Sequence, residues 1–416
     1  MKLACVIHRF GKDIAGGSEG HCRLVAEHLA ATHDVTVLTS CAHDHVTWAN
    51  HYPAGESTDG LLRVRRFPVA HRRDLARFRD ISRVVFSGRA SVEDEDEWFR
   101  VNGPDVPGLL DYLRDHGREY DRVLFWAYRY ATTYFGLPLV AGRAVLLPTA
   151  EEDRLIHAGG LAPFFALPSG YLFLTPEEAA LVADRAPVRA PSNVIGCGVD
   201  PIRDEGRDSS SRLAEHGVAD PFVLYLGRID PNKGCDSLLR HFSRYVAGGR
   251  TIQLVMAGPA NMPILEHPAI RALGFVDEAM RDALLSRARV LLMPSPYESL
   301  SMVLLEAWNH GVPALVNGRC AVLRGQVRRA DGGLYYRTSA EFGAALDYLL
   351  DRPDDARALG AQGRAYVDRE YRWPTVMAKV EDILARVTPS DERRTTNDEP
   401  NDERRTPNDE RRYRRS

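Results

Sequence analysis

Residues 222–234 read Phe-Val-Leu-Tyr-Leu-Gly-Arg-Ile-Asp-Pro-Asn-Lys-Gly and lead into an amphipathic stretch that ends near residue 245. The first five side chains are aliphatic or aromatic, which predicts a buried strand at residues 222–226. Gly227 ends this run, so Arg228 stands at the carboxyl end of the strand. Lys233 comes at the turn before a predicted helix at residues 235–245. A strand, a basic loop and a helix in this order predict a unit of an α/β fold with a parallel sheet.

Similar β-rich runs alternate with helical patterns along most of the chain. The runs in the first half are residues 3–7, 34–38, 61–65, 122–126, 144–147 and 171–175. The runs in the second half are residues 222–226, 253–257, 272–276, 290–293, 313–316 and 333–336. A chain of 416 residues is too long for one core. We therefore expect two doubly wound, Rossmann-like domains, residues 1–190 and 196–372, that face a ligand-binding cleft and are joined by a hinge rich in Pro and Gly.

The end of the chain has two parts of different character. Pro374 suits the first turn of a helix that runs to residue 387, and we expect the segment 373–388 to pack back on the first domain. From residue 389 to 416 the motif Asp-Glu-Arg-Arg recurs without apolar periodicity, so this tail is expected to be disordered.

Composition excludes several classes of protein. The chain is 44% hydrophobic and 27% charged with a net charge of -3, which argues against a nucleic-acid-binding protein. The six cysteines are scattered without ligand spacing, which favours a reduced, cytoplasmic protein without structural zinc. The first apolar run is too short for a signal peptide, and no run approaches the 18 residues of a membrane span.

Residues 297–306 (Tyr-Glu-Ser-Leu-Ser-Met-Val-Leu-Leu-Glu) place two carboxylates, Glu298 and Glu306, across the start of an apolar helix. Ser299 is the expected cap of this helix. A helix N-terminus offers unpaired N–H groups to a diphosphate, and carboxylates accept hydrogen bonds from sugar hydroxyls. Taken alone, Glu298 is equally explained as a carboxylate at a helix start and Glu306 as part of a solvated face.

Together, these segments resemble a known family. Residues 221–317 are similar to the nucleotide-binding half of the family-4 retaining glycosyltransferases, which have the GT-B fold. The matching pieces are Gly227-Arg228-x-x-x-x-Lys233-Gly234, residues 255–258, residues 274–276, and Pro294-Ser295-x-x-Glu298 running into Glu306-Ala307. Weaker similarity at residues 16–19 and 371–373 extends the resemblance to residues 1–388.

The resemblance implies roles for these residues. Arg228 and Lys233 would bind the donor diphosphate during catalysis, and Glu298 would contact the transferred sugar. The main chain at Phe275 and Val276 would hold the base, and Glu306 the ribose. The other donor-binding residues lie at the helix start: Ser299, Leu300 and Ser301. The family usually has Gly where Ser301 stands, and we expect only a modest effect on the approach of the diphosphate.

The first domain contributes a glycine loop and two candidate contacts, His8 and Glu151. Gly16 and Gly17 precede a predicted helix, and the family places this loop between acceptor and leaving phosphate. His8 ends the first strand, and the sequence leaves open whether it faces the cleft, the core or the surface. Glu151 follows another strand where related enzymes often have His. This departure puts the sugar specificity, or the activity itself, in question, and an acidic surface turn explains Glu151 equally well.

Residues 61–83 carry many arginines with apolar side chains at roughly helical spacing. This pattern fits peripheral docking on the anionic inner face of a membrane, or the holding of an anionic acceptor. A helix that packs its apolar stripe on its own domain is the simpler interpretation.

The sequence therefore predicts a retaining glycosyltransferase that moves a sugar from a nucleoside-diphosphate sugar to a glycan, lipid-linked or small-molecule acceptor. It lacks an Asp-x-Asp motif in the donor half, so we expect neither a metal nor another cofactor. A sugar-nucleotide 2-epimerase and a catalytically silent nucleotide-sugar-binding protein remain alternatives. A dinucleotide oxidoreductase is disfavoured because no Gly-x-Gly-x-x-Gly follows the first strand.

Overall fold

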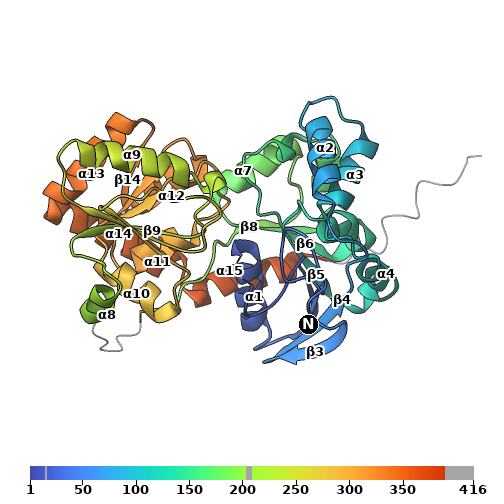
Figure 1. Ribbon diagram of the computed structural model, residues 1–416. Helices are drawn as coiled ribbons and strands as arrows, with labels where there is room; N and C mark the ends of the chain where they lie inside the picture. The colour runs from blue at the N-terminus through green and yellow to red at the C-terminus, as the bar shows by residue number, and fades with distance from the viewer. Residues whose placement is uncertain (15, 203–208, 389–416) are drawn as a thin grey trace, which may run out of the picture.

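The computed structural model describes residues 1–14, 16–202 and 209–388, so the tail predicted to be disordered lies outside the described residues. Figure 1 shows an α/β protein of two domains side by side, each built on its own sheet. The two-domain α/β prediction is confirmed. No helix of the described segments is long and apolar enough to cross a membrane.

The N-terminal domain is built on a sheet of order β3-β4-β2-β1-β5-β6-β7-β8. All pairings are parallel except β3 with β4. The strands are β1 Lys2–Val6, β2 Asp34–Ser40, β3 Gly55–Asp59, β4 Leu62–Phe67, β5 Arg122–Trp126, β6 Ala144–Leu147, β7 Gly170–Phe173 and β8 Ser192–Val194. Order reverses on either side of β1, so the carboxyl ends of β1 and β5 flank a topological switch point, where ligands bind in such sheets.

Helices cover both faces of this sheet. They are α1 Gly17–Leu29, α2 Leu75–Val85, α3 Val92–Asn102, α4 Pro107–His116, α5 Ala131–Gly136, α6 Leu161–Phe165 and α7 Pro176–Arg185. Side chains alternate between the two faces along each strand. In β1, Ala4 and Val6 therefore face the core under α2–α7, whereas Leu3 and Cys5 face the core that contains α1.

The C-terminal domain has a parallel sheet of order β11-β10-β9-β12-β13-β14. Its strands are β9 Phe222–Leu226, β10 Gln253–Ala257, β11 Ile270–Gly274, β12 Leu291–Met293, β13 Ala314–Asn317 and β14 Gly333–Tyr336. Its helices are α8 Ser209–Glu215, α9 Cys235–Ala247, α10 Glu278–Arg287, α11 Met302–Asn309, α12 Ala321–Ala330, α13 Ser339–Asp351 and α14 Pro353–Glu370. Helices α9 and α13 pack on one face, and α8, α10, α11 and α12 on the other. Helix α14 contributes to both cores, with Ala356 on the first face and Tyr366 and Val367 on the second.

The last helix, α15 (Trp373–Arg386), leaves the C-terminal domain and lies against the N-terminal one (Figure 1). Its buried side chains recur every three to four residues and join the core of β1 and α1: Trp373, Val376, Val380, Ile383 and Leu384. Burial of each contributes about 1.5–3 kcal/mol. The chain also passes between the domains after β8. This first connection lies beside the start of α15, since Val199 N–H donates to the carbonyl of Tyr371 at 2.7 Å.

Two expectations are altered by these elements. The hinge expected around residues 185–200 contains β8, which pairs with β7 as an edge strand of the first sheet. The basic stretch 61–83 is not one amphipathic helix, because residues 62–67 form β4 between β2 and β3 and the helix α2 begins at Leu75. Within α2, Phe78 and Ile81 pack against the core of their own domain. The structure therefore favours the simpler interpretation of this stretch.

Candidate functional site

Lys233 and Glu298 come from the carboxyl ends of two neighbouring strands, β9 and β12. Lys233 Nζ donates to Glu298 Oε1 at 2.8 Å, and the Glu298 side chain is 10% exposed. Gly234, which follows, has a left-handed φ of 73°, and a Cβ there would lie 2.4 Å from the Pro294 carbonyl oxygen. A glycine is therefore required for the Lys233 turn to pack against the strand that leads to Glu298.

Charges from both domains meet at this pair. Burial acts to lower the pKa of Lys233, but Glu298 and Glu151 outweigh it and the pKa is raised. Burial raises the pKa of Glu151, and Glu298 acts in the same direction against Arg129 and Lys233. Arg129, which follows β5, lies 4.0 Å from Glu151 and also pairs with Asp153. The structure thus brings Glu151, from the first domain, into the electrostatic surroundings of Lys233 and Glu298.

Arg228 stands at the end of β9 with its side chain 39% exposed and its Nε 3.7 Å from Asp230 Oδ2. That buried Nε has no hydrogen-bond partner among the described residues. Gly227 and Gly258 permit the close approach of the two loops here, since a Cβ on Gly258 would lie 2.0 Å from the Gly227 carbonyl oxygen. Arg228 also lowers the pKa of His45, though less than burial and Arg9 do, which places it opposite the N-terminal domain.

The helix that carries Glu306 begins later than expected. Ser301, not Ser299, caps α11, because its Oγ accepts from Leu304 N–H at 3.3 Å. The prediction that Ser299 caps this helix is wrong. The carbonyl of Ser299 instead accepts a hydrogen bond from Thr175 Oγ1 of the first domain at 3.1 Å. Leu300 is buried between the two serines.

Glu306 is paired with Arg281 from α10. The side chain of Glu306 is 20% exposed. The expected base-binding segment, Phe275 and Val276, follows β11 at the far edge of the same sheet, and Phe275 is 76% exposed. Glu306, in α11, and Phe275, after β11, thus both follow strands of the same sheet, and Arg281 is the partner of Glu306 in this structure.

On the N-terminal side, Gly16 caps α1 and Gly17 begins it. A Cβ on Gly16 would lie 2.3 Å from the carboxylate of Glu19, so glycine leaves room for that carboxylate to fold back. Glu19 accepts from His8 Nε2 at 3.0 Å and also pairs with Arg9. Burial acts to raise the pKa of Glu19, but His8 and Arg9 outweigh it and hold the pKa well below its usual range.

His8 is fully buried and stacks on Tyr130 with ring centroids 3.6 Å apart. Burial lowers its pKa despite Glu19, so the neutral imidazole is favoured. Of the placements left open by the sequence, the buried one is therefore observed for His8. His8 therefore supports the Gly16 loop from inside, through its hydrogen bond to Glu19.

Sequence reasoning missed Arg281 and Arg129, the partners of Glu306 and of Glu151. Each comes from an element more than twenty residues away from its partner, and neither stands in a motif. The one signal in the sequence was that both are cations, which could pair with the carboxylates of Glu151 and Glu306.

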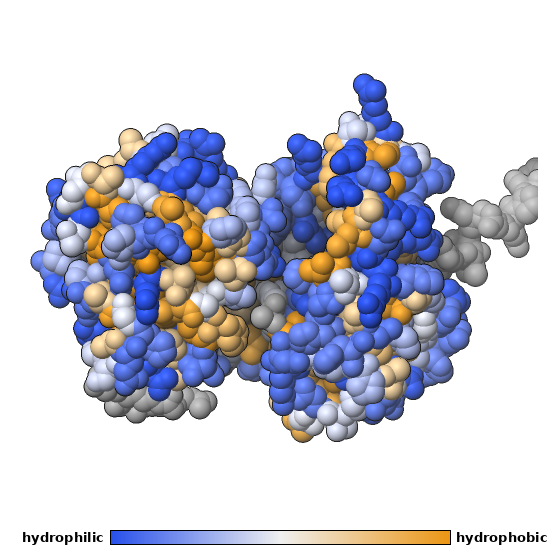
Figure 2. Space-filling model, in the orientation of Figure 1, coloured by the Kyte–Doolittle hydropathy of each residue, from blue (hydrophilic) through white to orange (hydrophobic). Residues whose placement is uncertain are grey.

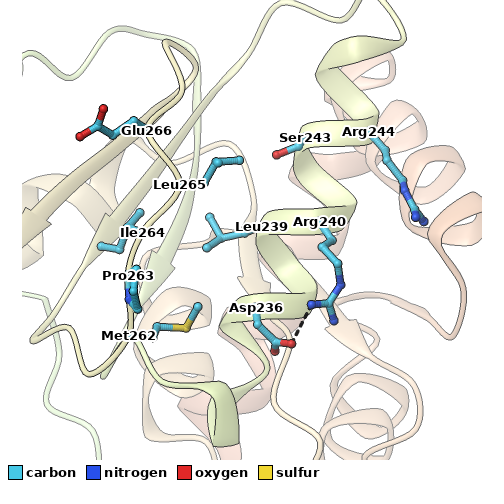
Figure 3. A pocket seen from close by; sticks show the side chains of 10 residues that line it. All are labelled: Asp236, Leu239, Arg240, Ser243, Arg244, Met262, Pro263, Ile264, Leu265 and Glu266. Atoms are coloured by element: carbon cyan, nitrogen blue, oxygen red, sulfur yellow. Dashed lines mark hydrogen bonds and ion pairs between the residues drawn. The ribbon is translucent and has the colours of Figure 1, made fainter.

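The space-filling view shows two lobes with a hollow between them (Figure 2). A separate groove of about 690 Å³ lies on the C-terminal domain, between α9 and the loop after β10. Figure 3 shows its apolar side chains, Leu239, Met262, Ile264 and Leu265, with Arg240 directed toward Asp236 at the rim. None of the predicted site residues lines this groove, so it is distinct from the site at the strand ends.

Comparisons with known proteins agree with this arrangement. Residues 220–352, most of the C-terminal domain, match the model of the family of glycosyl transferases group 1. A mannosyltransferase of Corynebacterium glutamicum, named as GDP-mannose-dependent and acting on a monoacylated phosphatidylinositol monomannoside, is 27% identical over 209 residues, 47% of this chain and 55% of that protein. The chain spans about half the length of the curated relatives it matches.

Solved structures extend the likeness to both domains. Sucrose-phosphate synthase from Thermosynechococcus elongatus has a TM-score of 0.68 at 15% identity, covering 92% of this chain and 98% of that one. HepE of Anabaena, solved with UDP and glucose, has a TM-score of 0.65 at 14% identity, covering 92% and 99%. The fold of this protein is the GT-B fold of glycosyltransferases.

Proposed function

We propose that this protein is a retaining glycosyltransferase that moves a sugar from a nucleoside-diphosphate sugar to an acceptor hydroxyl. The observation that carries the proposal is the convergence of Lys233, Glu298 and Arg228 at the strand ends that face the N-terminal domain. Cations there stabilise the charge that develops on a departing diphosphate. The group 1 domain and the GT-B fold support the same reaction class.

Each residue has a role in this proposal. Arg228 and Lys233 contact the diphosphate, and Glu298 orients Lys233 and accepts from a sugar hydroxyl. The N–H groups just before α11, at Leu300 and Ser301, bind phosphate oxygens. For this the Ser301 N–H exchanges its present acceptor, Gln326 Oε1 at 3.4 Å, for the phosphate. Glu306 exchanges Arg281 for the ribose hydroxyls, and the backbone at Phe275 and Val276 holds the base.

Transfer proceeds on the face from which the phosphate leaves. The bond between the anomeric carbon and the phosphate oxygen breaks as the acceptor oxygen bonds to that carbon. The proton of the acceptor hydroxyl passes to the departing phosphate. This route assigns Glu298 to holding the donor rather than to nucleophilic attack, and it needs no metal. We therefore expect full turnover in EDTA, and loss of all turnover there would contradict the metal-independent mechanism.

A thermal-shift screen of UDP-, GDP- and ADP-sugars tests the donor. A ligand at 100 times its dissociation constant should stabilise the protein by about 2.7 kcal/mol. Product analysis with the donor so identified then tests the reaction, with and without acceptors drawn from glycans, lipid-linked sugars and small molecules. Conversion of the donor without any acceptor would indicate a 2-epimerase. Donor binding with neither transfer nor slow hydrolysis would indicate a silent binding protein, the alternative that Glu151 raises.

A further inference from the structure

The first turn of α7 contacts three segments: the one that follows Glu298, the helix α12, and the turn after β6. Thr175 caps this helix, since its Oγ1 accepts from Glu178 N–H at 3.2 Å and donates to the Ser299 carbonyl of the other domain at 3.1 Å. Glu177 forms a two-point ion pair with Arg329 of α12, at 2.5 and 2.9 Å. Figure 1 shows α7 on the inner side of its domain, toward the C-terminal domain. This turn therefore fixes the distance between the domains at one point.

Glu178, on the same turn, is fully buried and binds two backbone segments at once. Its carboxylate accepts from Ala150 N–H at 2.7 Å and from Leu174 N–H at 2.5 Å. No cation pairs with it among the residues that the structure describes. Burial without a cation disfavours the charged form of this carboxyl group and costs free energy. We therefore explain Glu178 by the two backbone segments that its hydrogen bonds tie together, not by packing.

The segment held through Ala150 is strained. Thr149 has a left-handed φ of 49°, which is an outlier for a β-branched residue and costs about 1–3 kcal/mol. Such a turn persists only when its surroundings hold it. The hydrogen bond from Ala150 to Glu178 lies directly after the strained residue and directly before Glu151, the N-terminal carboxylate that interacts with Lys233 and Glu298.

We propose that Glu178 is a positioning residue of the transfer site. It holds the 148–151 turn and thereby the Glu151 carboxylate beside Arg129, while Thr175 on the same helical turn holds the segment that follows Glu298. The inference rests on the proposed function for its effect on turnover. The positioning itself is a property of the fold and can be measured without a substrate.

The chain offers a matched control for this idea. Glu95 is also buried, and its carboxylate accepts from two consecutive backbone N–H groups, Gly159 at 2.7 Å and Gly160 at 2.6 Å. It holds the turn that directly precedes α6. Glu178→Gln and Glu95→Gln therefore remove the same kind of interaction, since an amide keeps one acceptor oxygen and turns a donor toward the other N–H group.

The first measurement is hydrogen–deuterium exchange of the intact proteins. The peptide that covers residues 147–153 should exchange at least about 10-fold faster in Glu178→Gln than in the wild type, as expected for the loss of roughly 1.4 kcal/mol of local protection. In Glu95→Gln this peptide should remain unchanged. Unchanged exchange in Glu178→Gln, or equal acceleration in both variants, would overturn the positioning role.

The second measurement is kinetic and uses the donor found by the screen. We expect kcat to fall about 10-fold in Glu178→Gln with the donor KM within 2-fold, and Glu151→Gln should lose turnover similarly. The double variant should be no worse than Glu151→Gln alone, because Glu178 acts through Glu151. Additive losses would refute that coupling. If the wild-type protein were inactive with every donor, the proposed function would be refuted. The hydrogen–deuterium exchange measurement would still decide whether Glu178 holds the 148–151 turn.

Discussion

The ammonium of Lys233 lies 2.8 Å from the carboxylate of Glu298, 65 residues further along the chain. The contact joins the basic loop after β9 to the segment that leads into α11. Arg228, at the end of β9, keeps only a 3.7 Å ion pair with Asp230, and its buried Nε has no hydrogen-bond partner among the described residues. The proposed donor site therefore contains one cation with a hydrogen-bonded carboxylate partner, Lys233, and one cation whose Nε has no hydrogen bond, Arg228.

Replacement of these cations should slow turnover. We expect Lys233→Ala or Arg228→Ala to lower kcat roughly 10²–10³-fold, as when one preorganised charge stabiliser is lost. Arg240→Ala is the matched control, because Arg240 is an exposed cation of α9 that pairs with Asp236. Steady-state kinetics with the identified donor decides. Wild-type rates in both site variants would rule out this placement of the diphosphate.

Glu306→Ala should weaken donor binding. Loss of a charged acceptor for ribose hydroxyls costs about 1.5–3 kcal/mol, or roughly 10- to 150-fold in the dissociation constant. The same variant leaves Arg281 without its carboxylate. Titration calorimetry with the donor measures the effect, and Asp282→Ala, an exposed acid on the same helix as Arg281, is the control. Equal affinity in Glu306→Ala and wild type would remove Glu306 from the site.

Stability should depend on pH through Glu178. Burial raises the pKa of Glu178 from 4.5 to about 8, against the hydrogen bonds from Leu174 and Ala150. Between these values the folded protein keeps a proton that the unfolded chain has lost. This contribution is therefore complete below pH 4.5 and is lost as the pH rises through 8, by at most about 1.4 kcal/mol per pH unit.

Urea unfolding at several pH values from 5 to 8 measures this slope. The free energy of unfolding should fall less steeply with pH in Glu178→Gln than in the wild type, because the amide does not titrate. Parallel curves for the two proteins would show that Glu178 has an ordinary pKa in the folded state.

The basic stretch 61–83 should not bind membranes. Arg63 and Arg65 pair with Asp34 and Glu56 across the sheet, at 2.5 and 3.2 Å. Arg73 donates to the backbone carbonyl of Asn102 at 2.9 Å. We expect no co-sedimentation with anionic liposomes at about 0.15 M salt, where exposed charges are screened beyond about 8 Å. Binding that exceeds that to neutral liposomes would restore the membrane hypothesis.

The buried strands were the part of the fold most open to prediction. Strands β5, β6, β9, β10 and β14 have the predicted bounds, because apolar runs between polar segments mark buried parallel strands. Strand β3 was missed, since Gly-Glu-Ser-Thr-Asp is polar and lies exposed at the antiparallel edge. An edge strand buries little, so its sequence carries no hydrophobic signal.

The candidate site was predictable at its strand ends and not in its partners. Motif spacing placed Arg228 and Lys233 after β9, but their contacts depend on which strands are neighbours. Ser299 and Ser301 both suit a helix cap, and sequence spacing gave no means to choose between them. Glu178 escaped notice because an acid in the first turn of a helix is ordinary; its burial and its two backbone partners appear only in the folded chain.

The return of α15 to the first domain has a consequence for synthesis. During translation, residues 1–194 can form their sheet long before the C-terminal domain is made, yet the face that contains Leu3 and Cys5 lacks α15 until residues 373–387 emerge. Throughout that interval an apolar surface on the nascent N-terminal domain stays open to solvent or to a chaperone. The two domains thus complete their folding in the reverse of the order in which they begin it.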